Sequence, residues 1–331
     1  MPSEKYVLIQ SVVENGNNLI NIAWMCESAG VSRSGYYNWM SNKGKRDERE
    51  LQDLRDFVLV KVAFLARGKY KRGSRGIYMK FCHDGIVMSR KKIVRLMRKY
   101  GLACHIREAN PYRRMIKALA TDDVAQNLVN REFEKHGPGK IILTDITYLF
   151  YNHGKCIYLS VMKDAYTKQV LAHAQSVSLK VDFVLVTVIL LMEKHGDILA
   201  ENPWVHSDQG GHYTSVRFLQ LLKDSELTRS MSRKANCWDN APQESFFGHM
   251  KDEIDLSGCK TPGDVRIVID DYMDYYNSDR YQEHLGGLSP NEFANYLKTG
   301  FNPLKIKFSR PEALTDKVVQ QDTDGSCLSH H

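Results

Sequence analysis

The spacing of apolar residues changes near residue 136, and this change divides the chain into two differently built regions. Before it, apolar residues recur every three or four positions, as they do in amphipathic helices. Beyond it, β-branched and aromatic residues gather in short runs bounded by Gly, Asn and Pro, which is typical of strands and turns. The pattern therefore predicts a helical region followed by an α/β domain.

The first predicted unit, residues 1–45, is small and helical. Residues 18–28 have helical spacing, Gly30 interrupts it, and Ser32 is a suitable N-cap for a second helix. This order is typical of a helix-turn-helix, although a helical hairpin without a DNA-binding function fits equally well. Residues 46–65 are predicted to form a connecting helix.

The next segment, residues 66–120, is predicted to be a second helix-turn-helix-like module that binds DNA. Residues 61–117 contain 17 Lys and Arg and two acids, so this stretch carries +15 and the rest of the chain −8. Such asymmetry favours a polyanion as partner over a merely solvated basic surface. A helix is expected between Ser89 and Gly101, with an apolar face and a cationic remainder. The predicted DNA-binding residues of this module are Arg72, Arg75, Arg90, Lys91, Lys92, Arg95 and Lys99.

A linker at 121–135 is expected to lead into the α/β domain at 136–300, and a basic, then disordered tail follows at 301–331. Three strands are predicted first, then helix, strand, helix, strand and a helix opened by Pro242. This order is that of a ribonuclease-H-like fold, with a mixed five-stranded sheet and flanking helices. The expected elements are strands 140–151, 155–163, 169–174, 203–207 and 228–232, and helices 181–194, 215–222 and 261–277.

Three acids of this domain are candidate metal ligands. Asp145 lies in the middle of the first strand, Asp208 follows a buried strand, and Glu244 lies in the first turn of a helix. A buried acid is costly unless it is paired or bound to a cation, and ligand sites gather where strands end. Each acid alone also fits a solvent-facing strand position, a tight turn or an ordinary helix surface. Together they favour a magnesium site of the kind that cleaves phosphodiesters.

The predicted helix around Glu244 has a second polar residue on the same face. Glu244, Gly248 and Lys251 recur at i, i+4 and i+7, so they lie along one side. A carboxylate for a metal and an ammonium group for a phosphate, with the smallest residue between them, would suit an approaching DNA strand.

The cysteines and the apolar runs exclude several classes of protein. Seven cysteines are scattered without a Cys-x-x-Cys pair, which disfavours a disulfide framework and a structural zinc site. No run of about 18 apolar residues and no secretory signal occur. A cytoplasmic protein with reduced thiols and no membrane partner is therefore expected.

Several sequence blocks resemble a known group of enzymes. TDITY, HSDQGGHYTS and WDNAPQESFFGHMKDE, with 35 residues between Asp208 and Glu244, resemble the integrase-type Asp-Asp-Glu core of retroviral integrases and bacterial transposases. Over nearly the whole chain, the sequence is most similar to the second-frame (OrfB) product of the insertion sequence three family. That wider similarity rests on GVSRSGYYNWM, SRKKIVRLMRKYGL, LVNREF, YYNSDR and LGGLSPNEF.

The resemblance implies an integrase core and a transposase. Such an enzyme nicks the 3′ ends of its element with water and joins the freed 3′-OH to target DNA, without a covalent protein–DNA intermediate. It implies that Asp145, Asp208 and Glu244 are catalytic and bind two Mg²⁺ or Mn²⁺ ions, and that Lys251 contacts the transposon end. The implied partners are the terminal inverted repeats, target DNA, further copies of the chain, and a first-frame (OrfA) partner or fusion, on the bacterial nucleoid.

The sequence departs from this pattern in three places. It has no His-His-Cys-Cys zinc module, no heptad run is visible, and the loop GKYKRGSRGIY differs from the family's usual Tyr-Gly-Tyr-Arg wording. Two other functions therefore stay open. One is a DNA-binding regulator with an inactive core, and the other is a ribonuclease-H-like nuclease that cuts without joining.

Overall fold

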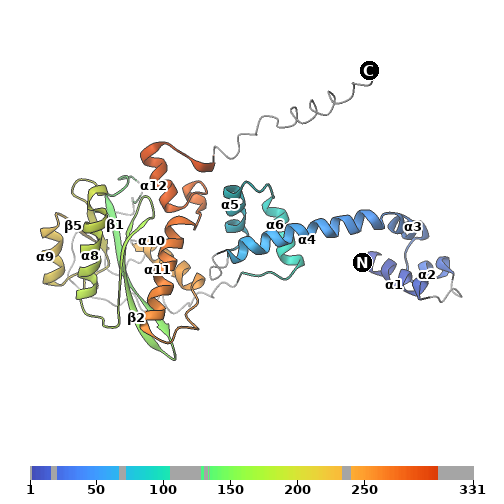
Figure 1. Cartoon of the computed structure of the whole chain (residues 1–331), viewed down its shortest axis with the longest axis horizontal. Helices are drawn as coiled ribbons and strands as arrows, with labels where there is room; N and C mark the ends of the chain where they lie inside the picture. Colours follow the sequence, from blue (N-terminus) through green and yellow to red (C-terminus); the bar gives the residue numbers. More distant parts are fainter. Residues whose placement is uncertain are drawn as a thin grey trace, which may run out of the picture. The chain divides into compact units, whose positions relative to one another are not determined.

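The computed structural model describes two compact units. One comprises Met1–Val62 with Ile93–Leu102, and the other comprises Ala63–Lys92 with Ala103–His331 (Figure 1). The residues described are 2–15, 21–66, 72–104, 128–129, 133, 135–232 and 240–304. Within these ranges, no helix has the length and apolar character needed to cross a membrane.

Three short helices open the smaller unit: α1 (Pro2–Glu14), α2 (Ile22–Ser28) and α3 (Arg33–Ser41). They pack around Ile9, Met25, Cys26 and Tyr36. The N-cap predicted at Ser32 is confirmed, because its hydroxyl accepts the Gly35 N–H at 3.1 Å. Helix α1 has no counterpart among the predicted helices, since its apolar residues make only a weak stripe and only Ile9 is buried.

The rest of this unit pairs two helices. Helix α4 (Lys43–Leu65) runs for 23 residues and begins three residues before the predicted connecting helix. Helix α6 (Arg90–Lys99) follows Ser89, whose Oγ accepts the Lys92 N–H at 3.3 Å, as predicted for a cap. Ring contact between Phe57 and Tyr100, with centroids 4.3 Å apart, joins the two helices.

The basic module predicted at 66–120 is not one compact unit. Its first helix, α5 (Ser74–Asp84), belongs to the larger unit, whereas residues 93–102 belong to the smaller one. The physical reason lies in long-range contacts, because Asp53 of α4 binds Arg95 of α6 while His83 of α5 binds Glu292 near the C-terminus. Residues 105–120 of the module, most of the predicted linker and residues 305–331 of the tail lie outside the described residues.

The larger unit is organised around a mixed five-stranded sheet with the order β3-β2-β1-β4-β5. The first three strands are antiparallel, and the last two run parallel to β1. This is the ribonuclease-H-like arrangement that the sequence predicted. The strands are β1 (Ile141–Tyr151), β2 (Lys155–Asp164), β3 (Val170–Ser176), β4 (Trp204–Ser207) and β5 (Thr228–Met231).

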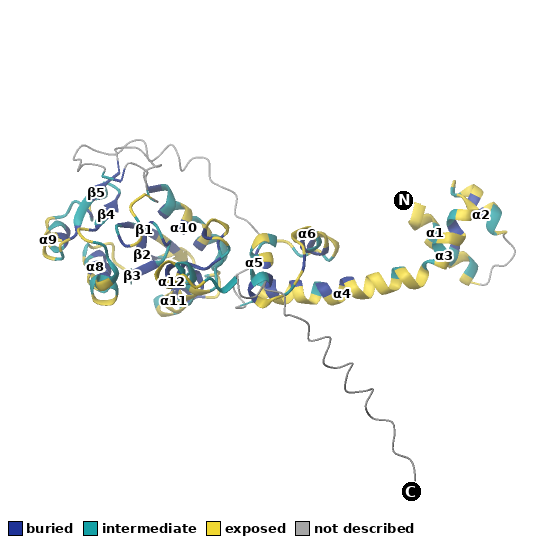
Figure 2. Ribbon diagram, turned by 90° about the horizontal axis from the view of Figure 1, so that it is seen from above, coloured by how far each residue is buried: buried dark blue, intermediate teal, exposed yellow. Residues whose placement is uncertain are grey.

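Helices cover both faces of this sheet (Figure 1). Helices α8 (Asp182–His195) and α9 (Val216–Asp224) enclose one apolar core. Helices α10 (Ala241–Glu253) and α11 (Pro262–Ser278) enclose the other, so the strands between them are mostly buried (Figure 2). The remaining elements are two short 3-10 helices, η2 (Gly196–Ile198) and η4 (Glu283–Leu285), and helix α12 (Pro290–Thr299).

Candidate active site

Two of the candidate acids come from adjacent parallel strands. Strand β1 pairs with β4 so that Leu143 lies opposite His206. Asp145 and Asp208 each lie two residues beyond this pair, Asp145 within β1 and Asp208 just after β4 ends. Because opposite residues of parallel strands point to the same face, this register brings the two carboxylates to one side of the sheet. Both residues are half-buried.

The third acid, Glu244, lies on a helix that a lysine of the sheet binds at its start. Lys163 of β2 lies opposite Leu143, and its Nζ donates to the carbonyl of Pro242 at 2.8 Å. Helix α10 also packs against β1. Glu244 lies two residues after Pro242 in the first turn of α10 and is half-buried.

The charges of Asp145 and Asp208 both act on two tyrosines, Tyr213 and Tyr148. Tyr213 is buried, and its hydroxyl lies 3.4 Å from Thr144 Oγ1. Burial raises the pKa of Tyr213 well above its usual value, and the charges of Asp145 and Asp208 raise it further. Burial likewise raises the pKa of Tyr148, with smaller contributions from the same two carboxylates. The charges of both acids therefore influence the same two hydroxyl groups.

The donor chemistry of this site fits a hard divalent cation, since three carboxylates offer only oxygen ligands. Asp145 Oδ1 accepts the Ile146 N–H at 2.8 Å, and Asp208 Oδ1 accepts the Gly210 N–H at 2.9 Å. The side chains described here do not form a group of three His, Cys, Asp or Glu at metal-binding distance. The register of β1 and β4 thus relates Asp145 to Asp208, and a common metal site for all three acids stays a prediction.

Two side chains with amide groups precede Glu244 in the sequence. Asn240 precedes α10 and is buried, as is Gln243. Asn240 Oδ1 and both amide atoms of Gln243 have no hydrogen-bond partner among the described residues. Buried polar atoms of this kind are uncommon and recur at functional sites. The segment 233–239, which holds part of the WDNAPQE block, lies outside the described residues.

Lys251 lies two turns along α10 from Glu244. Its charge lowers the pKa of Cys156, although burial raises that pKa overall. Cys156 belongs to β2 and lies opposite Phe150 in β1. Helix α10 therefore runs from Lys163 at one end of the hairpin toward Cys156 at the other. Glu244 and Lys251 both belong to α10, and their separation by seven residues places them on the same side of this helix, as predicted.

Arg72 is not the surface cation that the sequence predicted. Only 6% of it is exposed, and its guanidinium donates to the carbonyls of Ala66 at 3.4 Å and Asp279 at 3.2 Å. The guanidinium carbon also lies 5.2 Å from the ring centre of Tyr275. Because its donors are used inside the protein, Arg72 supports the fold rather than contacting DNA.

Arg95 and Lys99 are also committed to internal contacts. Arg95 donates two hydrogen bonds to Asp53, at 2.7 and 2.6 Å, and Lys99 donates to both Asp53 and Glu50. These bonds lower the pKa of Asp53, led by that from Arg95. The two cations therefore join α6 to α4, and we expect this role in place of the predicted contact with DNA.

The remaining predicted cations lie in the first turns of α5 and α6. Arg90 and Lys91, in the first turn of α6, are exposed, and Lys92 is half-buried. Arg75 of α5 is exposed and forms an ion pair with Glu283 at 3.3 Å. Such exposed pairs contribute little to stability, so Arg75 can exchange its partner readily.

Sequence reasoning did not identify three residues that shape this site. Tyr213 lies inside the HSDQGGHYTS block, but only the fold shows that its hydroxyl lies beside Thr144 and that the charges of Asp145 and Asp208 act on it. For Lys163 the sequence does contain a signal, because a lysine in an otherwise apolar strand requires a polar partner. Arg280 lies in the YYNSDR block, and its partner is Glu253 at the end of α10.

Comparisons with known proteins identify the family to which the chain is similar. One integrase core domain family matches residues 135–237, and a second family with the same description matches residues 244–296. The insertion element IS600 uncharacterized 31 kDa protein of Shigella sonnei is 32% identical, over 81% of this chain and 97% of its own length. Transposase InsF for insertion sequence IS3A of Escherichia coli is 30% identical, over 88% of this chain and 98% of its own length.

Solved integrase cores are more distant. The HTLV-2 integrase catalytic core domain in complex with magnesium is 14% identical, with a TM-score of 0.38, over 47% of this chain and 96% of that one. The catalytic core domain of BIV integrase is 17% identical, with a TM-score of 0.37, over 50% of this chain and 99% of that one.

Proposed function

Because the chain belongs to the insertion sequence three (IS3) family of transposases, we propose that it nicks the 3′ ends of its element and joins them to target DNA by direct transesterification. Asp145, Asp208 and Glu244 act as the metal-binding catalytic residues. The observation that carries this proposal is the common register of Asp145 and Asp208, with α10 bound at its start by Lys163.

The proposed chemistry has two steps at phosphorus. In the first, a water oxygen bonds to phosphorus, the bond to the 3′ oxygen breaks, and the element keeps a free 3′-OH. In the second, that 3′ oxygen bonds to a target phosphorus and releases another 3′-OH, so no oxidant or energy source is consumed. Two Mg²⁺ or Mn²⁺ ions would lower the barrier by stabilising the entering and leaving oxygens.

The residues of the chain have separate tasks in this scheme. The three carboxylates hold the ions, and their half-buried setting strengthens electrostatic interactions relative to those in water. Lys251 contacts a phosphate of the element's end from the same helix as Glu244. Arg75, Arg90, Lys91 and Lys92 supply further backbone contacts, which position the DNA without reading its sequence.

The test uses purified chain, Mg²⁺ and a labelled duplex that carries the element's terminal inverted repeat. The expected products are a 3′ nick at the element end and a strand-transfer product with target DNA, both of which EDTA removes. Nicking without joining would favour a ribonuclease-H-like nuclease. Binding without either product would favour a DNA-binding regulator.

A matched reaction tests the assembly. Joining both ends of an element to one target requires two active sites held together, so we expect more than one copy of the chain in the DNA complex, on the bacterial nucleoid. The same chain fused to a first-frame product is assayed in parallel. Activity in the fusion alone would mean that this chain needs that partner.

A second prediction separates DNA contacts from structural cations. Replacing Lys91 with Ala should weaken binding to all DNA sequences and reduce the slope of log affinity against log salt by about 0.9, as expected for one lost phosphate contact. Replacing Arg95 with Ala should leave that slope unchanged but lower the free energy of unfolding, because Asp53 loses two of its hydrogen bonds. Salt titration of a labelled duplex and urea denaturation measure the two effects. Equal slope changes in both variants would contradict the assignment.

A further inference from the structure

The block YYNSDRY has no task in the chemistry described so far, yet it makes contacts in several directions. It begins inside α11, where the Asn277 side chain accepts the Val170 N–H at 2.9 Å and donates to the Val170 carbonyl at 2.8 Å. These two bonds imitate a further strand at the edge of β3. The segment that follows, residues 279–283, is therefore fixed to the sheet at its start.

The same segment holds the far end of the catalytic helix. Arg280 donates to Glu253, the last residue of α10, at 3.0 Å from Nε and at 2.8 Å from Nη2. Less than a fifth of either side chain is exposed. Burial disfavours the charged guanidinium, but Glu253 raises the pKa of Arg280 above its usual range. A two-pronged pair of this kind fixes angle as well as distance. Helix α10 is thus held by Lys163 at its start and by Arg280 at its end.

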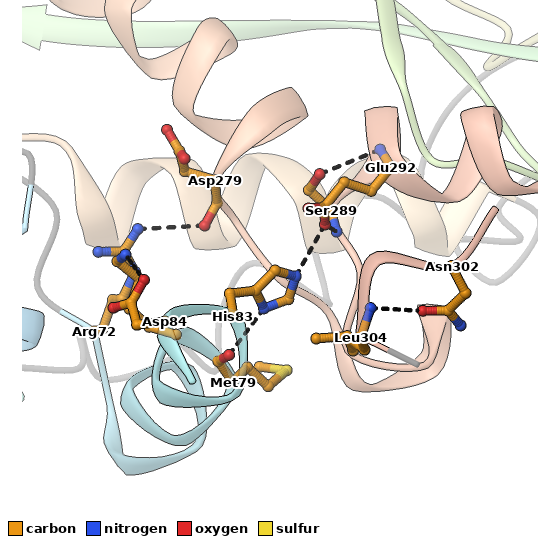
Figure 3. Close-up of polar contacts among 10 residues, drawn as sticks. Arg72, Met79, His83, Asp84, Asp279, Ser289, Glu292, Asn302 and Leu304 are labelled. Atoms are coloured by element: carbon orange, nitrogen blue, oxygen red, sulfur yellow. Dashed lines mark hydrogen bonds and ion pairs between the residues drawn. The ribbon is translucent and has the colours of Figure 1, made fainter. Parts of the chain in front are cut away.

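The segment also holds α5. The Asp279 carbonyl accepts a hydrogen bond from Arg72, as Figure 3 shows. The Tyr281 ring stacks on His83 of α5, with centroids 3.6 Å apart and planes 9° apart. His83 Nε2 lies 3.1 Å from Glu292 Oε2 at the start of α12 (Figure 3). The His83 side chain is buried, so α5 is packed against this segment rather than loosely attached.

The three elements enclose one space. A cavity of about 750 Å³ is lined by Ser74 and Arg75 at the start of α5, by Ser245 and His249 of α10, and by Glu283 and His284. Ser245 and His249 each follow directly after Glu244 and Gly248, so this wall is the neighbour of the proposed catalytic face. A shift of α5 relative to α10 would change the shape of this cavity directly.

We propose that Arg280 is a positioning residue, which, with Tyr281 and the Asp279 carbonyl, sets the catalytic helix at a fixed place relative to α5. The inference rests on the proposed function. DNA bound by Arg75 at the start of α5 is thereby held so that one particular phosphodiester lies next to Glu244 and Lys251. The segment decides which phosphodiester is nicked and how fast, while the metal ligands carry out the chemistry.

The test compares Arg280→Lys with the wild-type chain on the labelled element end. Lysine keeps the charge but cannot form the two-pronged bond. The expected result is a nicking rate about 10²-fold lower at saturating DNA, as a displacement of about 1 Å can cause, with nicks spread to neighbouring phosphodiesters. DNA affinity is expected to change by less than about twofold. His83→Gln, which loosens α5 instead, is expected to spread the nicks in the same way.

Two further variants keep the test decisive. Arg217→Lys changes an exposed ion pair between α9 and α8 and should leave rate and nick position unchanged. The exchange of both charges, Glu253→Arg with Arg280→Glu, should recover part of the rate and the single nick position if Arg280→Lys proves unstable. Wild-type rate and position in both Arg280→Lys and His83→Gln would overturn the proposal. A wild-type chain that does not nick at all would instead overturn the proposed function.

Discussion

Asp208→Asn is expected to lower nicking and strand transfer by about a thousandfold or more. Asparagine keeps the size of the side chain and can retain the turn at Gly210, but it removes the negative charge that a divalent ion requires. Metal stabilisation of charge at phosphorus is worth several kcal/mol, and each ~1.4 kcal/mol is a factor of ten in rate. Asp145→Asn and Glu244→Gln are expected to behave alike, because the three acids act as one unit.

The measurement is a time course of nicked and joined products under single-turnover conditions, together with calorimetric titration of Mn²⁺. Asp224→Asn, an exposed acid of α9, is the matched control and should keep both activities. Lys251→Ala should weaken binding of the element end and leave Mn²⁺ binding intact. Joined products that survive all three acid substitutions would overturn the assignment of the site.

The elements of the α/β domain could be predicted because local signals specify them. Proline at the start of α10 and serine caps before α3 and α6 lie where the sequence places them, and β1, β2 and β4 begin and end within one residue of the prediction. Helix α1 was missed because its apolar residues do not form a clear stripe, so tertiary contact with α2 and α3 stabilises it.

The division into units could not be predicted, because it depends on pairs that are far apart in the sequence. The cations of 66–120 look alike in the sequence. Only the structure shows that Arg95 binds Asp53, that Arg72 is buried beside Tyr275, and that Lys91 stays exposed. A count of positive charges measures the field of a segment but does not say which cations already have partners inside the protein.

The candidate site could likewise be predicted from the sequence only in part. The spacing of Asp208 and Glu244 and the setting of Asp145 indicated which acids belong together. The register that aligns Asp145 with Asp208 depends on pairing between β1 and β4, some 60 residues apart along the chain. Lys163 and Arg280, which hold α10 at its two ends, became visible only through their partners Pro242 and Glu253. The sequence thus proposes reacting groups, whereas the residues that bind α10 at its two ends became apparent only in the structure.

Lys163 leads to the second large expected effect, a dependence of stability on pH. Burial lowers the pKa of Lys163 well below its usual value, and Lys168 and Arg280 lower it further. Between this lowered pKa and about 10.5, the amine is neutral in the folded protein but protonated in the unfolded chain. The unfolded state therefore binds more protons, and the free energy of unfolding should rise with pH by up to about 1.4 kcal/mol per unit.

Lys163→Met removes this titration and should flatten the rise, although it also removes the hydrogen bond to the Pro242 carbonyl, worth about 1 kcal/mol. Urea denaturation at several pH values between 7 and 10 measures the slope for the wild type and the variant. Lys223→Met, at an exposed position of α9, serves as the control and should keep the wild-type slope. Equal slopes in all three proteins would mean that Lys163 stays charged when folded. Its ammonium group would then be held by the Pro242 carbonyl and by the face of the Phe246 ring, 5.0 Å from the ring centre.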